Sequence, residues 1–225
     1  MTRLRLAPRE GPAAIPRLPA GERRAQLLEA AVQCFAAHGY RGTTTERLAR
    51  AAGISEPVLY RHFPSKQALF VALLEHAGRA TLSEWRRAIA PLASPMDKLR
   101  VLLRLNPAAH PQLGRFYRII FHAQSEISDP LILQALQQHY QRYAAFLTRL
   151  IRSAQRVGYV RKDVLASGMA WQLIHAAIGF AFIKPLAIPG HATPAAVEQA
   201  ICLLLEQLSG TEARVTKRPG PRRRR

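Results

Sequence analysis

The sequence predicts an all-α fold, and three observations lead to it. Apolar residues recur at spacings of three and four along most of the chain. Glycines and prolines divide it into segments of helical length. These segments lack the alternation of polar and apolar residues that is typical of a half-buried strand. The chain has 225 residues, of which 48% are hydrophobic, so it can bury a sizeable core without disulfides.

The first helix is expected over residues 22–38. Leu28, Val32 and Phe35 recur at i, i+4 and i+7, which places them on one helical face. Gly39 follows directly and suits the C-cap position, because glycine adopts a positive φ without strain. The pattern therefore predicts an amphipathic helix with a defined end.

The second helix is short and is expected over residues 43–53. The letters TTTE allow a capping box between Thr43 and Glu46. Gly53 ends the segment, and it permits the positive φ that a tight turn between two helices often needs. We therefore expect another helix to begin within a few residues.

The third helix is expected from Ser55, its N-cap, to Phe63. Pro64 ends it, because the residue before a proline disfavours helical geometry. Leu59 and Phe63 are the inward positions, so the other side chains face outward. Two short helices joined by about three residues form the helix-turn-helix pattern. A plain surface hairpin is the alternative, but the basic balance of the chain and the aromatic and cationic side chains on this helix favour the helix-turn-helix.

Longer helices are expected in the rest of the chain. Ser65 can cap a fourth helix that extends beyond Trp85. The remaining helices are expected at residues 95–105, 112–125, 130–157, 164–186 and 194–208. The arm before the first helix and the tail after the last contain prolines and arginines without any helical period, so we expect both to be flexible.

The charge of the chain points to a polyanionic partner. Lysine and arginine number 33 against 14 aspartate and glutamate, which gives a net charge of +19. Residues 1–21 contribute +3 and residues 211–225 contribute +6, which leaves +10 for the part between them. Nucleic acid and an anionic membrane surface are the partners that such an excess favours.

Two further features concern the compartment. Cys34 and Cys202 lie in apolar helical patterns, so we expect two buried thiols in a reducing compartment. The most apolar window, residues 171–183, is 13 residues long, too short to span a bilayer. The first 20 residues lack the apolar stretch of a signal peptide. The expectation is a soluble cytoplasmic protein.

Residues 30–74, AAVQCFAAHGYRGTTTERLARAAGISEPVLYRHFPSKQALFVALL, resemble the N-terminal DNA-binding region of the TetR family of bacterial transcriptional regulators. The matching positions are Phe35, Gly39, Tyr40, Thr43, Thr44, Ala49, Ala52, Gly53, Leu59, Tyr60, His62, Phe63, Lys66 and Leu69. The resemblance implies a ligand-responsive repressor, associated with the nucleoid, that binds a palindromic operator as a dimer. A small apolar or amphipathic effector would release it. It divides the chain into a flexible basic arm (1–20), a helix-turn-helix DNA-binding domain (21–67), a helical effector-binding and dimerisation domain (68–210) and a basic disordered tail (211–225).

The resemblance also implies roles for individual residues at the double-stranded DNA operator. Thr43 or Thr44 would bind phosphate at the start of the second helix, and Lys66 would pair with phosphate, as suits a lysine near a helix N-terminus. Tyr60 and His62 would contact backbone phosphates. The residues expected to face or flank the bases are Ser55, Glu56, Pro57, Val58 and Arg61.

Two of these positions depart from the usual pattern of the family. At Glu56 a basic or neutral residue is commoner, and at Val58 a hydroxyl often occurs. A glutamate repels phosphate but can accept from the amino group of a cytosine, and a valine can contact a thymine methyl. We therefore expect both residues to influence which operator is preferred.

The segment 168–183 is apolar almost throughout, with Gln172 and His175 as its strongly polar side chains. Such a helix is usually buried on every side. We expect one side to line the subunit core and the other to meet a second subunit. The helices at 164–186 and 194–208 would then form a four-helix homodimer interface.

A ligand pocket is expected among aromatic and histidine side chains of the later helices. As a set they suit an apolar pocket with a few polar groups, although each alone can equally fill the core. The candidates are Phe116, Tyr117, Phe121, His122, Tyr143, Trp171 and His175. No metal site is expected, because His122 and His175 are far apart in sequence and have no evident cysteine or carboxylate partner. No cofactor is expected either.

Other classes of protein fit the sequence less well. An enzyme is disfavoured, since the sequence has no glycine-rich phosphate loop, metal-ligand motif or nucleophile motif. A non-specific architectural DNA or RNA binder is favoured mildly by the arginine-rich ends, but the helix-turn-helix signature opposes it. A peripheral membrane protein would need a long amphipathic basic helix, and none is evident. Competition by random DNA separates specific from non-specific binding.

Overall fold

The computed structural model describes residues 20–105 and 111–209, and every regular element in these ranges is a helix. The all-α prediction is confirmed. The bounds differ from those expected by no more than three residues, close to the ordinary spread of helix ends. The elements are α1 (Ala20–His38), α2 (Thr45–Ala51), α3 (Glu56–His62), α4 (Lys66–Ile89), α5 (Pro95–Arg104), α6 (Pro111–Gln124), α7 (Pro130–Arg156), α8 (Ala166–Ile183), the short 3-10 turn η1 (Lys184–Leu186) and α9 (Pro194–Ser209).

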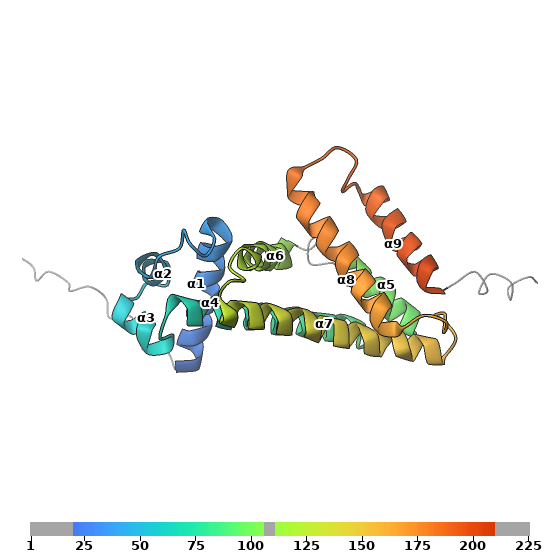
Figure 1. Cartoon of the computed structure of the whole chain (residues 1–225), viewed down its shortest axis with the longest axis horizontal. Coiled ribbons are helices and arrows are strands. Elements are labelled where there is room, and N and C mark those ends of the chain that lie inside the picture. Colours follow the sequence, from blue (N-terminus) through green and yellow to red (C-terminus); the bar gives the residue numbers. More distant parts are fainter. Residues whose placement is uncertain (1–19, 106–110, 210–225) are drawn as a thin grey trace, which may run out of the picture.

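The molecule is elongated, with α1, α2 and α3 at one end and α8 and α9 toward the other (Figure 1). α4 and α7 connect the two ends and run parallel, because Gln67 at the start of α4 donates to Asp129 at the N-cap of α7 and Trp85 lies against Phe146 further along. We call α1 to α3 the head. The body is α5, α8 and α9 with the far halves of α4 and α7.

Two apolar cores stabilise the ends, and α4 contributes to both. In the head core, Phe35 of α1 meets Phe70 of α4 edge to face, with ring centroids 4.8 Å apart. Ile119 of α6 is fully buried in the same core, so α6 packs on the head. In the body core, Trp85 of α4 lies 4.9 Å from the Tyr143 ring of α7. α4 is therefore a continuous structural link between the two cores.

The start of α2 differs from the expected capping box. The N-cap is Thr44, whose side chain accepts from the backbone N–H of Arg47 at 3.2 Å. Thr43 is fully buried, and its hydroxyl donates to the carbonyl of Gly39 at 2.7 Å. A buried hydroxyl requires such a partner, and carbonyls at the end of a helix lack one. Glu46 pairs instead with Arg50.

The turn between α2 and α3 has the backbone geometry that the sequence indicated. Gly53 has a φ of +66°. Its N–H donates to the carbonyl of Arg50, and the next N–H, from Ile54, donates to Ala49 at 3.0 Å. The prediction that Gly53 supplies a positive φ between the two short helices is confirmed.

A glycine of α4 and a histidine of α7 are in close contact. A Cβ on Gly78 would lie 3.1 Å from Nδ1 of His139. The His139 ring also packs 4.4 Å from the Tyr143 ring and bonds to the backbone of Leu74. Nδ1 is buried without a partner. Burial disfavours the charged imidazolium and lowers the pKa of His139 to about 4.

The helix α8 is more exposed than its sequence suggested. Together with η1 it forms a segment, Ala166–Leu186, long and apolar enough to cross a membrane by length and composition, although core helices of soluble proteins meet the same criterion. Only 28% of its most apolar window is buried within the chain. The window of residues 171–183 underestimated the length of this apolar segment, because the segment begins at Ala166 and continues through α8 into η1.

The two cysteines have different environments. Cys34 is buried in the head core, as expected, and burial raises the pKa of its thiol. Cys202 is exposed, so the expectation of a second buried thiol was wrong. The inward face of α9 is formed by Ile201, Leu205 and Leu208. Cys202 follows Ile201 directly and therefore lies about 100° away from it around the helix.

We predict that His139 makes the stability of the protein depend on pH. The pKa of His139 is lower in the folded than in the unfolded chain, so the unfolded chain binds more protons between pH 4 and 6.5. Stability should therefore be lost as the pH falls through this range, by about 2 kcal/mol between pH 7.5 and pH 5. The measurement is urea unfolding of wild type and His139→Gln at both pH values. Equal pH dependence in the two proteins would contradict the prediction.

Candidate DNA-binding face and ligand cavity

The head presents one polar face built from the start of α2 and the outer side of α3. Leu59 and Phe63 face the core and fix the rotation of α3, and the guanidinium of Arg24 covers the Phe63 ring at 4.7 Å. The face has the width of one helix, which is what a major groove admits. Of the expected DNA-contacting residues, the exposed ones are Thr44, Ser55, Pro57, Tyr60 and Arg61, and the half-buried ones are Glu56, Val58, His62 and Lys66.

Thr45 connects the two helices of this face. The hydroxyl of Tyr60 donates to Oγ1 of Thr45, and that hydroxyl donates to Oε1 of Glu56, each at 3.5 Å. Glu56 and Tyr60 are four residues apart, so they lie on one side of α3. Sequence reasoning missed Thr45, although it is the third threonine of the TTTE motif. Its position orients two candidate DNA-contacting side chains.

The two threonines proposed for phosphate binding lie in different environments. The hydroxyl of Thr43 faces the interior and is bonded to the carbonyls of Gly39 and Cys34. Thr44 is exposed at the start of α2. Its oxygen accepts from Arg47, which leaves the hydroxyl proton available to a ligand. Of the two, only Thr44 presents a hydroxyl on the surface of the head.

Lys66 is bonded within the head. Its ammonium donates to the carbonyl of Tyr40 at 3.0 Å and to that of Thr43 at 3.1 Å. It also lies 4.4 Å from the centroid of the Tyr40 ring, a cation–π contact. Two of its three donors are used by these carbonyls. The side chain thus fastens the connection between α1 and α2 to the start of α4.

Among the described residues, arginines without an ion pair occur on this face, as they also do on α4, α6 and α7. Ion pairs are formed by Arg41, Arg50, Arg79, Arg87, Arg100, Arg104, Arg115 and Arg161. Within the described residues, no ion pair involves Arg47 or Arg61, and both are exposed. The head therefore presents uncompensated positive charge beside α3, as binding to a phosphate backbone requires.

The end of α6 and the connection to α7 contact the head and the start of α4 through three side chains. Nε of Arg41 donates to Glu126 at 2.9 Å. The amide of Gln67 donates to Asp129, and this bond lowers the pKa of that carboxyl. The ring of His122 lies so close to Gly39 that a Cβ there would be 3.2 Å from Nδ1. α6 and the residues that follow it therefore contact the connection between α1 and α2, next to the candidate DNA-binding face.

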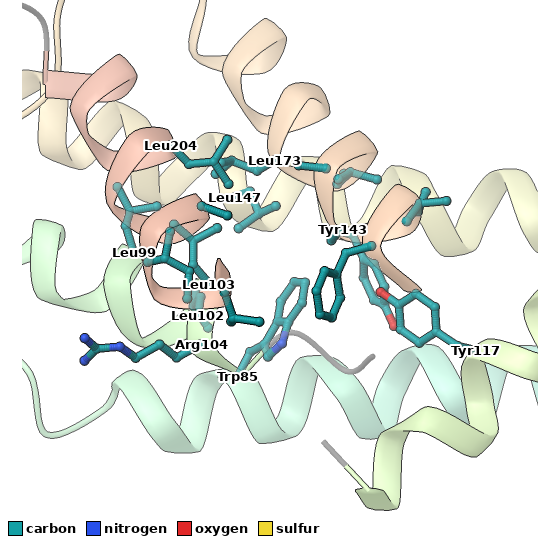
Figure 2. A pocket seen from close by; sticks show the side chains of 18 of the residues that line it. Trp85, Leu99, Leu102, Leu103, Arg104, Tyr117, Tyr143, Leu147, Leu173 and Leu204 are labelled. Atoms are coloured by element: carbon teal, nitrogen blue, oxygen red, sulfur yellow. The ribbon is translucent and has the colours of Figure 1, made fainter. Parts of the chain in front are cut away.

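A cavity of about 270 Å³ lies in the body, between α4, α5, α7, α8 and α9, and Tyr117 of α6 also lines it. In Figure 2, Tyr117 and Tyr143 lie toward one end and Arg104 with Leu102 and Leu103 toward the other, with Trp85 between them. Most of the wall is aliphatic or aromatic. Sequence reasoning missed Trp85 and the leucines of α5, whose periodicity indicates burial but not a shared cavity.

The structure brings two of the seven candidate pocket residues, Tyr117 and Tyr143, to this cavity. The other five do not line it. Phe116 is buried in the head core, and Phe121 packs between Tyr117 and Phe182. His122 lies against Gly39, as described above. Trp171 and His175 are exposed on α8, because the inward side of that helix is formed by Ala170, Leu173, Ile174 and Ala181.

The polar groups of the cavity wall differ in whether they have partners. Tyr143 bonds to Thr81, and the Tyr140 hydroxyl accepts from Gln124. Desolvation raises the pKa values of Tyr117, Tyr140 and Tyr143, so all three hydroxyls stay protonated. Nε1 of Trp85 and Nδ1 of His191 are buried without a partner. Among the described residues, no group of three or more His, Cys, Asp or Glu side chains could hold a metal ion.

Comparisons with known proteins agree with this architecture. The family model described as bacterial regulatory proteins, tetR family, matches residues 27–73. The HTH-type transcriptional activator FasR of Mycolicibacterium smegmatis is 37% identical over 118 residues, which are 52% of this chain and 52% of that protein. The HTH-type transcriptional regulator RutR of Escherichia coli K12 is 34% identical over 145 residues, which are 62% of this chain and 63% of that protein.

The likeness also extends to solved structures. A TetR transcriptional regulator from Chloroflexus aurantiacus superimposes with a TM-score of 0.70 at 22% identity, covering 83% of this chain and 93% of that one. At this identity the likeness concerns the fold. In sequence, the chain spans between about half and just under two thirds of the length of the two curated relatives described above.

We predict that Lys66 is needed for the stability of the head. Lys66→Ala removes two hydrogen bonds from a charged donor and leaves two carbonyls without partners, so it should lower the free energy of unfolding by about 1–3 kcal/mol. The measurement is urea unfolding followed by circular dichroism. Lys98→Ala is the control, since Lys98 has no described bond to another element and should change stability little. Equal stability of Lys66→Ala and wild type would contradict the prediction.

Proposed function

Since the match over residues 27–73 assigns the chain to the TetR family of DNA-binding transcriptional regulators, we propose that it is a ligand-responsive repressor. It binds a palindromic operator as a homodimer in the cytoplasm, on the nucleoid, and a small effector releases it. The observation that carries the proposal is the presence of two different sites in one molecule. An uncompensated basic face lies at the head, an apolar cavity lies in the body, and α6 reaches both.

Sequence-specific recognition of DNA would require α3 to lie in the major groove. Tyr60, Thr44 and Arg47 lie at the rim of the face, where phosphates would be met. Glu56 and Val58 lie in the first turns of α3, where base edges would be met. This assignment is supported by the exposure of Thr44, Arg47 and Tyr60 and by the inward position of Leu59 and Phe63.

The homodimer would form through α8 and α9. The outer side of α8 and η1 exposes Trp171, Phe182 and Leu186, the last two at 62% and 64%. The neighbouring α9 exposes Leu203 at 52%. Monomeric proteins rarely leave such contiguous apolar surface in water. A second copy of the same face would cover it and would also place two α3 helices symmetrically for a palindrome.

Release by an effector would be transmitted by α6. Tyr117 of α6 lines the cavity, and the same helix continues to His122 against Gly39 and then to Glu126, which holds Arg41. A ligand that moves Tyr117 would therefore shift the contacts beside α2. A ligand changes DNA affinity only by binding one of the two arrangements more tightly than the other.

The experiment that tests the function is selection of bound fragments from the source genome by the full-length protein. We expect one inverted repeat, bound in the presence of a large excess of random DNA. A reporter behind that site then gives the sign of regulation: deletion of the gene should raise its expression. Lowered expression would indicate activation, which is the role in the name of the relative FasR. Binding without sequence preference would overturn the proposal.

We predict that two kinds of substitution on α3 have different effects. Tyr60→Phe should weaken binding to all sequences by a similar factor, because a phosphate contact carries no sequence information. Val58→Ala and Glu56→Ala should instead change which base is preferred, at about 1–3 kcal/mol per contact. The measurement is a binding-site selection with each variant, with folding checked by circular dichroism. If Tyr60→Phe changes the preferred sequence and the other two do not, the orientation of α3 is wrong.

We predict that Phe182→Arg disrupts the homodimer. A charge in the centre of an apolar interface would be buried without a partner, which disfavours association strongly. Light scattering should show a monomer, and affinity for the full inverted repeat should fall at least tenfold. Val157→Arg, at another exposed apolar residue outside the proposed interface, is the control and should remain dimeric. A dimeric Phe182→Arg protein, or wild type that partitions into lipid vesicles, would contradict this assignment.

A further inference from the structure

A second positively charged surface follows the outer side of α7. Residues 130–162 contain five arginines and one lysine but no aspartate or glutamate. Within the described residues, four of these arginines are exposed on α7 and form no ion pair. The four, which we call the α7 arginine stripe, are Arg142, Arg149, Arg152 and Arg156.

Helical geometry places the four side chains of the stripe on one face of α7. Arg142, Arg149 and Arg156 follow one another at intervals of seven residues, and each interval rotates the position by about 20° around the helix. Arg152 lies about 60° from Arg149. The stripe therefore covers an arc of roughly 80°, and at 1.5 Å per residue it is about 21 Å long.

The connection that follows α7 adds a further cation to this surface. An open hollow of about 490 Å³ lies at the end of the helix, and the residues that line it are Arg152, Gln155, Arg156 and Lys162. Nε2 of Gln155 fixes the connection by donating to the carbonyls of Arg161 at 2.9 Å and Val164 at 3.0 Å. Asp163, the first acid after the stripe, accepts from Nε of Arg161 at 2.7 Å. This carboxylate is therefore already paired outside the stripe.

The stability of α7 does not account for the stripe. Arg149 and Arg152 are like charges three residues apart, and Arg152 and Arg156 are like charges four residues apart, spacings at which repulsion destabilises a helix. The helix dipole favours cations at a C-terminus, but this effect is confined to the last turn and does not extend to Arg142 or Arg149. A cationic surface of this kind suits an external polyanion.

The chemistry of the stripe favours a phosphate backbone over the other anionic surfaces. A guanidinium binds phosphate oxygens bidentately. From Arg142 to Arg156 no large hydrophobic side chain of α7 is exposed. An anionic membrane is bound through an apolar face as well as charge, and a protein interface usually requires buried aromatic anchors. Sequence-independent contact with a nucleic acid duplex, in contrast, is supplied by cations alone.

The stripe lies far along α7 from the head. Asp129, at the N-cap of α7, accepts from Gln67 beside the head, and the helix then runs to the opposite end of the molecule (Figure 1). At 1.5 Å per residue, Arg149 lies about 30 Å and Arg156 about 40 Å along the helix from Asp129. The stripe and the face of α3 are therefore two separate basic surfaces.

We propose that the α7 arginine stripe is a second, sequence-independent binding surface for double-stranded DNA, which contacts a different duplex segment from the one at α3. A protein bound to its operator through α3 would thereby hold a second segment of duplex through its phosphates. The inference rests on the proposed function only in treating α3 as the other DNA-binding surface.

The first experiment measures the stripe without the contribution of the head. It uses a head variant, Arg47→Glu with Arg61→Glu, to which either of two sets of substitutions is added. The stripe set is Arg149→Gln, Arg152→Gln and Arg156→Gln. The control set is Arg79→Gln, Arg87→Gln and Arg100→Gln, which removes the same number of charges from exposed arginines that have carboxylate partners. Circular dichroism checks that each protein is folded.

Fluorescence anisotropy then follows the binding of these proteins to a short duplex of random sequence at several salt concentrations. The head variant should bind the duplex, and the stripe set should weaken this binding at least tenfold. It should also reduce the log–log salt slope by about 2–3, since each lost phosphate contact accounts for about 0.9. The control set should weaken binding less than threefold. A head variant that does not bind, or equal losses with both sets, would overturn the inference.

The second experiment tests whether two duplexes are held at once. Full-length protein without the head substitutions is bound to an immobilised operator, and a labelled duplex of random sequence is added. Wild type and the control set should retain the label, whereas the stripe set should bind the operator within threefold of wild type and retain less than a tenth of the label. Wild type that retains no second duplex would overturn the inference. Loss of operator affinity in the stripe set would place the stripe on the same duplex as α3 and would also overturn it.

Two further outcomes separate this inference from its rivals and from the proposed function. Anionic phospholipid vesicles or polyglutamate that bind through the stripe more tightly than the duplex would overturn the assignment to DNA. If no operator is found but the stripe set still abolishes binding of the random duplex to the head variant, the inference stands and the proposed function is wrong. If an operator is found and the stripe set has no effect in either experiment, the function stands and this inference is wrong.

Discussion

The parallel packing of α4 on α7 is the constraint on which the rest of the molecule depends. Gly78 lets the two helices approach until the His139 ring lies against the glycine, where any side chain would have to displace it. Because α4 contributes to both the head core and the body core, this contact sets how the two ends are placed relative to each other. It is maintained by a buried neutral imidazole, whose charging would disfavour the folded chain.

The packing of the helices also places the arginine side chains relative to the carboxylates. Several arginines of the body and of the outer helical faces pair with nearby carboxylates, often one turn away, as in Arg79 with Glu75. On α2, Glu46 pairs with Arg50, and Glu56 of α3 accepts from Thr45, whereas Arg47 and Arg61 form no ion pair within the described residues. Arg47 and Arg61 therefore leave positive charge unpaired beside α3, as Arg149, Arg152 and Arg156 do at the far end of α7. A local positive field of this kind attracts a polyanion.

α6 is the helix that contacts both the cavity in the body and the core of the head. Its buried side, with Ile119 and Ile120, packs in the head core, while Tyr117 reaches the body cavity. Glu126, just beyond its end, is bonded to Arg41 in the connection between α1 and α2. The helix thus has one set of contacts at the cavity and another beside the candidate DNA-binding face.

The sequence by itself determined the helical class, the order and ends of the helices, and the short helix-turn-helix. These are local properties: the spacing of Leu28, Val32 and Phe35, and the glycine at position 53, act within a few residues of the chain. Only the tertiary structure decided which side chains meet across distant segments. Periodicity shows that Trp85, Tyr143 and Leu102 are buried but not that they share a cavity, and it cannot separate Trp171, which faces outward, from its inward neighbours. Neither the bonding of Lys66 to Tyr40 nor the inward turn of Thr43 follows from spacing, because both depend on how α1, α2 and α4 pack together.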